Sequence, residues 1–156
     1  MAPANELVTT LRALIALETA AIDAYEAAIT DVDLVTVVNQ LAVFRADHAG
    51  HLIDLQLMLR TLDEPVSERT PVPERAGTPD APCAAGAILA LRALRPGIAE
   101  RLSAYRLALA TPMPPPIARR LADHLEDEEL HLWYVERTLG QLQRAGATWR
   151  DDLRGS

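Results

Sequence analysis

The stretch RADHAGHL, residues 45–52, places two histidines one helical turn apart where an apolar helix face is expected. The i, i+3, i+4 spacing of a core-facing stripe runs through Leu41, Phe44, His48, His51 and Leu55. Both histidines therefore lie on the side of the helix that faces the core. A buried histidine needs a hydrogen-bond partner or a metal ion, so this stretch bears on both the fold and the function.

Apolar stripes of the same period predict helices over about residues 6–30, 34–62, 85–110 and 116–144. The chain of 156 residues is 49% apolar but only 4% aromatic, a balance typical of helical bundles. Short connections near residues 31–33 and 111–112 favour two antiparallel hairpins. Between the hairpins lies a linker, residues 63–84, with five prolines. We therefore expect one all-α domain over residues 1–156, a four-helix bundle whose two hairpins are joined by a long Pro-rich crossover.

The charge balance excludes several classes of partner. A net charge of −7 argues against binding nucleic acid or an anionic membrane surface, because both require a basic face.

No apolar run approaches the roughly 20 residues that span a bilayer. The first residues, MAPANELVTT, lack the basic and apolar regions of a signal peptide. With a single cysteine as well, we expect a cytoplasmic protein.

Ionisable residues also fall on the core-facing stripes of two other predicted helices. Glu18 lies four residues from both Leu14 and Ile22. The stripe of the last helix runs through Ile117, Leu121, His124, Glu128, His131 and Val135. All four histidines of the chain are thus expected to face inward.

These polar residues lie near the midpoints of their helices, so a bundle brings them to one level. Two buried carboxylates are costly unless a cation accompanies them, and mixed histidine and carboxylate ligation suits iron, manganese or zinc. The spacing Glu128-x-x-His131 is the one that di-metal carboxylate bundles use. Simpler interpretations remain for single residues. His124 is a ligand, a proton carrier or a core histidine, and Tyr25 and Tyr105 fit packing with buried hydroxyls.

The segment LEDEELHLWYVE, residues 125–136, resembles the last bundle helix of bacterioferritins and related ferritin-like proteins, as does the spacing of Glu18 and Tyr25. The resemblance implies a di-iron centre that oxidises Fe(II) with O₂ or peroxide, with Tyr25 close to the reaction as a catalytic candidate. It implies the following metal ligands: Glu18 as a terminal ligand, Glu128 as a bridging carboxylate, and His51 and His131 as nitrogen ligands. Asp47 and Asp127 match the aspartates that orient those histidines.

The chain departs from that family at two ligand positions. His48 stands where the family has a glutamate, and matching Tyr25 to Tyr105 places Ile98 at the counterpart of Glu18. Glu100 lies roughly 200° further round the helix, which makes it a poor substitute unless the helix is kinked near Pro96.

We therefore expect an asymmetric site of one or two metal ions. One ion would bind Glu18, His48, His51 and Glu128. A second, weaker one would bind Glu128 and His131, with His124 as a further candidate ligand. Haem is not expected, because Ala49 corresponds to the haem-ligating methionine of bacterioferritins.

Three hypotheses about function follow. The first is a ferritin-like metal-binding protein that handles and oxidises iron, or binds another divalent metal, and forms a homodimer or another small homo-oligomer. The second is a helical interaction module whose site has degenerated. The third is a redox-inert zinc or manganese site that stabilises the bundle.

Overall fold

The computed structural model describes residues 2–62 and 84–154, with side chains described for residues 5–62 and 85–146. The described residues form four helices, α1 (Ala2–Asp31), α2 (Val35–Thr61), α3 (Ala84–Leu109) and α4 (Pro115–Arg154), and none of them forms a strand. The all-α prediction is confirmed. The Pro-rich crossover and Cys83 lie outside the described residues.

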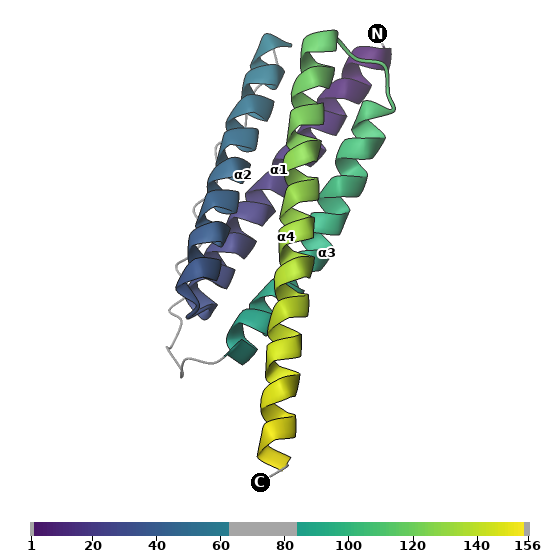
Figure 1. The fold of residues 1–156 in the computed structure, drawn as a ribbon. Coiled ribbons are helices and arrows are strands. Elements are labelled where there is room, and N and C mark those ends of the chain that lie inside the picture. Colours follow the sequence, from purple (N-terminus) through teal and green to yellow (C-terminus); the bar gives the residue numbers. More distant parts are fainter. Residues whose placement is uncertain (1, 63–83, 155–156) are drawn as a thin grey trace.

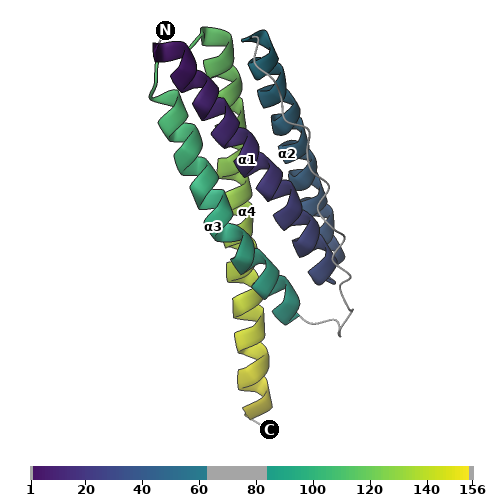
Figure 2. The same cartoon turned by 180° about the vertical axis from the view of Figure 1, so that it is seen from behind.

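The four helices lie side by side as a bundle (Figures 1 and 2). Helix α1 packs against α2 and α3, and α4 packs against α3 and, less closely, against α2. Following the chain in Figure 1, α1 and α4 run downwards, whereas α2 and α3 run upwards. Packed neighbours are therefore antiparallel. Helices α2 and α3 point the same way.

Local sequence explains where the second helix of each hairpin begins. The Leu34 carbonyl accepts hydrogen bonds from the amides of Val37 and Val38, which starts α2 directly after the turn. At the start of α4 the Pro114 carbonyl accepts from the amides of Ile117 and Ala118. Proline suits this first turn because its missing N–H would have no partner there.

Two apolar clusters fill the two ends of the bundle. One cluster is centred on Tyr25, Phe44, Leu91, Ile98 and Val135. The other is centred on Leu11, Leu55, Leu59, Tyr105 and Leu121. Each fully buried leucine of this kind contributes about 2 kcal/mol of transfer free energy to folding. Along α1, α2 and α4 the buried ionisable residues lie between the two clusters. The polar layer of the core is therefore packed between two apolar layers.

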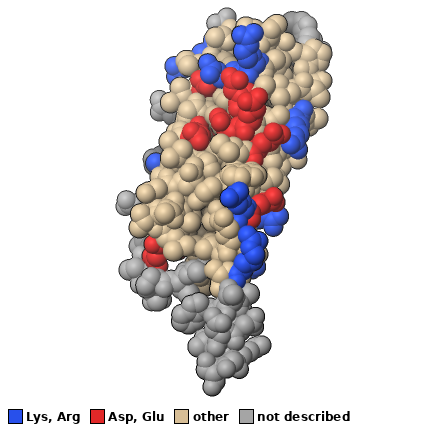
Figure 3. All heavy atoms as spheres, in the orientation of Figure 1, with Lys and Arg blue, Asp and Glu red and all other residues tan. Residues whose placement is uncertain are grey.

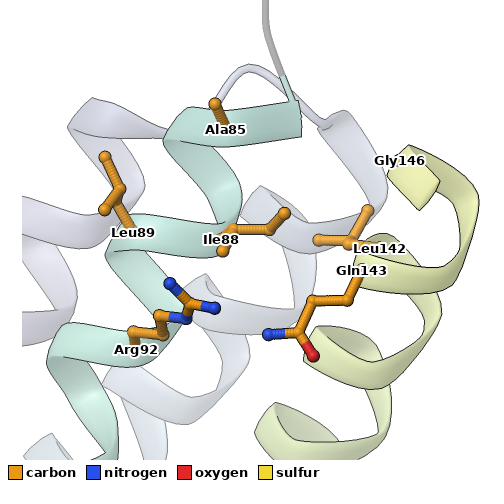
Figure 4. A pocket seen from close by; sticks show the side chains of 7 residues that line it. All are labelled: Ala85, Ile88, Leu89, Arg92, Leu142, Gln143 and Gly146. Atoms are coloured by element: carbon orange, nitrogen blue, oxygen red, sulfur yellow. The ribbon is translucent and has the colours of Figure 1, made fainter. Parts of the chain in front are cut away.

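The last helix is longer than the expected 116–144, because it continues through Gly146 to Arg154. Glycine favours a helix end but costs only about 1 kcal/mol inside a helix, and no proline follows it in this segment. Near this end α3 and α4 enclose a groove of about 420 Å³ (Figure 4), lined by Ala85, Ile88, Leu89, Arg92, Leu142, Gln143 and Gly146. None of the predicted site residues lines it.

Across the described helices, no segment combines the length and the apolar character needed to cross a membrane.

Candidate metal centre

Four buried side chains from three helices converge in the middle of the bundle. They are Glu18 from α1, His48 and His51 from α2, and Glu128 from α4. Each contributes one nitrogen or oxygen atom to a group in which all these atoms lie within 4.8 Å of one another. These are the four residues that the sequence pattern assigned to the first ion. The structure thus brings together a set of side chains that can hold a metal ion.

Of the two carboxylates in the group, Glu18 makes more close polar contacts with other side chains. His48 Nδ1 lies 2.6 Å from its Oε2, and the Tyr105 hydroxyl donates to its Oε1 over 2.5 Å. His51 Nδ1 lies 3.6 Å from the same Oε1. Burial alone would raise the pKa of Glu18, but the hydrogen bond from His48 and the charges of the two histidines outweigh it and lower the pKa well below its ordinary value. Glu18 is therefore ionised at neutral pH.

Glu128 is held mainly by an arginine. The Arg101 guanidinium, itself only 4% exposed, donates from Nε to Glu128 Oε1 over 2.9 Å. His48 Nδ1 lies 3.3 Å from that oxygen, whereas Oε2 has no hydrogen-bond partner in the described part of the chain. Burial raises the pKa of Glu128 to about 7, although Arg101 opposes the rise. With Arg101 beside it but no metal ion bound, this carboxylate is close to half protonated at neutral pH.

Two reciprocal pairs across the α2–α4 interface orient the histidines. His51 Nε2 lies 3.1 Å from Asp127 Oδ2, and His131 Nε2 lies 3.1 Å from Asp47 Oδ2. In each pair the imidazole N–H donates to the aspartate, so Nδ1 keeps its lone pair when the ring is neutral. Neither Nδ1 atom has a hydrogen-bond partner among the described residues. Each aspartate thus lies beside a histidine of the other helix.

These aspartates connect the buried centre to the surface. The side chains of Asp47 and Asp127 are 37% and 48% exposed. Acidic side chains gather on the face formed by α2 and α4 (Figure 3). Burial together with the charge of Asp127 raises the pKa of Asp47. The site is therefore buried and bordered by carboxylates on its α2–α4 side.

The protonation of the two paired histidines differs. Burial alone would lower the pKa of His51, but Glu18 and Asp127 outweigh it and raise the pKa above the ordinary value. For His131, burial and the nearby charges of His48 and His51 lower the pKa to about 2. His131 is thus neutral across the physiological range, with a free donor atom.

His131 and His124 are both buried, but neither belongs to the group of four. The His131 ring centroid lies 5.0 Å from that of His48. The His124 ring stacks on His51 at 4.0 Å, and its Nε2 lies 3.2 Å from Asp54 Oδ2. Burial lowers the pKa of His124. Its position beside His51 makes it a packing partner of the cluster.

The two hairpins contribute equivalent positions to this centre. The separation between Tyr25 and Tyr105 also relates Glu18 to Ile98, His48 to Glu128, His51 to His131, Asp47 to Asp127 and Phe44 to His124. Ring contacts follow the same correspondence. Tyr25 meets Phe44 edge-on at 6.2 Å, and Tyr105 meets His124 edge-on at 5.7 Å. The core thus has approximate two-fold symmetry, which makes each departure from it informative.

One departure explains the different surroundings of the two tyrosines. The Tyr105 hydroxyl donates to Glu18, but the counterpart of Glu18 is Ile98, which offers no acceptor. Correspondingly, the Tyr25 hydroxyl is buried without a hydrogen-bond partner among the described residues. Tyr25, the catalytic candidate, instead packs on the His48 ring at 5.0 Å.

Sequence reasoning missed three residues of this centre: Arg101, Asp54 and the role of Tyr105 as a donor to Glu18. Arg101 continues the spacing of Leu94, Ile98 and Tyr105 on α3, and this register was the available signal. Asp54 lies one turn beyond His51, on the same edge of α2 as Asp47. Glu100 is exposed, as the sequence indicated, so α3 supplies no carboxylate to the cluster through it.

Comparison of the chain with protein-family models gives no match, and comparison with curated protein sequences gives none either.

Proposed function

We propose that this chain is a ferritin-like protein that binds one divalent metal ion through Glu18, His48, His51 and Glu128. The observation that carries the proposal is the convergence of these four buried side chains within 4.8 Å. Two imidazoles and two carboxylates form a donor set that iron, manganese and zinc all accept. An ion at their centre would compensate the carboxylate charge that burial otherwise penalises.

The distances between donor atoms support this proposal. Ligands about 2.1 Å from a common ion lie about 3 to 4.2 Å apart, depending on the angle between them. His48 Nδ1 and Glu128 Oε1 are 3.3 Å apart, and His51 Nδ1 and Glu18 Oε1 are 3.6 Å apart. The 2.6 Å contact between His48 and Glu18 is a hydrogen bond that must lengthen as its proton leaves. Only a small rearrangement of side chains is needed.

An unpartnered nitrogen points the same way. Among the described residues, His51 Nδ1 is buried with no hydrogen-bond partner. Leaving a buried polar atom unpaired costs about 1 to 3 kcal/mol. A metal ion would satisfy this atom, whereas the N–H of His51 is already engaged by Asp127.

Iron is the ion we propose, on the resemblance of residues 125–136 to ferritin-like proteins. Iron bound here would supply one-electron chemistry towards O₂ or peroxide. In that reaction Tyr105 would fix the orientation of Glu18, and Asp127 would fix the His51 ring. Tyr25 would pack against the ring of the ligand His48, with a buried hydroxyl that has no hydrogen-bond partner among the described residues.

Metal content of tag-free protein tests the proposal. We expect one ion per chain after incubation with Fe(II) under argon, and about a tenfold or greater loss of affinity in Glu18→Gln, because a ligand is removed without a change of shape. Glu26→Gln is the matched control, since Glu26 lies on α1 but forms an exposed ion pair with Arg45. Oxidation of the bound iron in air would then appear as ferric absorbance.

One observation favours a metal-free alternative. Arg101 already pairs with Glu128, and a protonated His51 would pair with Glu18, so the core can balance its charges without a metal ion. The chain would then be a helical interaction module. Absence of metal at every loading, with unchanged thermal stability, would establish this alternative. Zinc or manganese without ferric absorbance would instead establish a redox-inert structural site.

A further inference from the structure

Two changes on α3 alter the charge of one half of the symmetric centre in the same direction. Ile98 occupies the position equivalent to Glu18 and removes a carboxylate. Arg101 adds a buried guanidinium, whereas its counterpart on α1 is Ala21, which is fully buried and uncharged. Bundles that hold two metal ions supply a carboxylate from each of the four helices. Here the α3 half has a cation in that region.

Donor atoms nevertheless remain in the α3 half. His131 Nδ1 and Glu128 Oε2 are both buried, and neither has a hydrogen-bond partner among the described residues. The His48 and His131 rings meet edge-on, with centroids 5.0 Å apart. A neutral imidazole ligates through one nitrogen, so His48, which would bind the first ion through Nδ1, adds no further donor. Symmetry would place a second ion beside His131 and Glu128. Missing donors alone therefore do not explain why the site should hold one ion.

Charge does explain it. Glu18, Glu128 and Arg101 together carry one net negative charge when both carboxylates are ionised. One divalent ion changes this sum to one net positive charge, and a second ion would raise it to three in a buried site. The guanidinium lies 2.9 Å from Oε1 of the carboxylate that both ions would have to share. Repulsion at this range weakens the binding of a second ion on the order of a hundredfold or more.

We propose that Arg101 is a fixed internal counter-ion that replaces the second metal and limits this centre to a single ion. The inference rests on the proposed function, because it specifies how many ions that site takes. Arg101 is a positioning and specificity-determining residue in this account, since it acts on the ions through Glu128. The packing of α3 accommodates it: its Nη1 lies 3.4 Å from the place where a Cβ on Gly97 would be.

Native mass spectrometry of chelator-treated protein loaded with Co²⁺ tests the inference, because it counts the ions on each chain. We expect one ion on the wild type and two on Arg101→Gln, with the first ion bound about tenfold more tightly once Glu128 is free. Arg101→Lys keeps the charge and should return the count to one. Arg106→Gln is the matched control, since Arg106 lies on α3 and pairs with Glu129 on α4, but at the surface.

The outcomes separate this inference from the proposed function. One ion on the wild type and still one on Arg101→Gln, with unchanged affinity, overturns the inference and leaves the proposed function standing. No ion on the wild type overturns both, whatever Arg101→Gln binds. If Arg101→Gln does not fold, Arg101→Met makes the same charge change without a polar atom that needs a partner.

Discussion

Replacing the two core tyrosines by phenylalanine should change stability in opposite directions, although they occupy equivalent positions. Tyr105 donates to the ionised carboxylate of Glu18 over 2.5 Å, whereas the Tyr25 hydroxyl has no hydrogen-bond partner in the described residues. Both rings are fully buried, so loss of apolar contact is small and equal in the two variants. The comparison therefore isolates the hydroxyl.

The magnitudes follow from the surroundings of each hydroxyl. A hydrogen bond to a charged group contributes about 1.5–3 kcal/mol, and Tyr105→Phe also leaves Glu18 with one donor fewer in a dry interior. We expect this variant to lose about 2–3 kcal/mol of unfolding free energy. Burying a hydroxyl without a partner costs about 1–3 kcal/mol, so Tyr25→Phe should be neutral or gain about 1 kcal/mol. The two variants should differ by about 3 kcal/mol.

Urea unfolding of metal-free protein at pH 7, followed by far-ultraviolet circular dichroism, measures this difference. An equal loss in both variants would show that the hydroxyls contribute alike, and the asymmetry derived from Ile98 would be incorrect. A loss below about 0.5 kcal/mol in Tyr105→Phe would refute the hydrogen bond to Glu18 as a stabilising contact.

The remaining predictions concern protons and the metal ion. Because burial raises the pKa of Glu128 from 4.5 to about 7, the metal-free folded state holds this proton more tightly than the unfolded chain does. The resulting stabilisation is complete below pH 4.5 and is lost as the pH rises through 7, so the stability difference between wild type and Glu128→Gln should change by about 3 kcal/mol across that window in urea titrations. Parallel pH curves for the two proteins would contradict this. Asp127→Asn should weaken metal affinity about 10- to 100-fold in calorimetric titrations, because Asp127 orients His51, whereas exposed Asp123→Asn should not. Equal affinities for these variants would remove Asp127 from the site. The loaded protein should release its ion on acidification, because histidine ligands must be deprotonated. Ion retention at pH 4 in a dialysis assay would argue against histidine ligation.

Much of the centre could be predicted because helical periodicity fixes which face a residue occupies. Glu18 has apolar residues four positions away on both sides, and His48 and His51 continue the stripe from Leu41 to Leu55. Their common level follows from their place near the helix midpoints, where the bundle leaves them between two apolar clusters. These features depend on local sequence and helix geometry alone.

Arg101 shows where such reasoning stops. An arginine at the edge of a helical stripe is normally solvent-exposed, so its register with Ile98 and Tyr105 predicted a surface side chain as readily as a buried one. Burial became favourable only because Glu128, on another helix, offers a carboxylate at 2.9 Å. The pairing depends on the packing of two helices, so the residue pattern of one helix cannot predict it. The continuation of α4 past Gly146 escaped prediction for a different reason, because glycine permits a helix end without requiring one.

Two of the departures from symmetry, Ile98 and Arg101, lie on α3, and they depend on one another. Ile98 takes away the carboxylate that would accept from Tyr25, and it also removes a ligand of a second ion. Without a second ion, Glu128 is a buried carboxylate that lacks one of its compensating cations. Burial raises its pKa to about 7 even though Arg101 lies beside it. An arginine one turn from Ile98 supplies the charge that the second ion would have supplied. Donor atoms alone therefore overstate the capacity of this core, since His131 keeps a free nitrogen in a place where charge, rather than ligand number, is limiting.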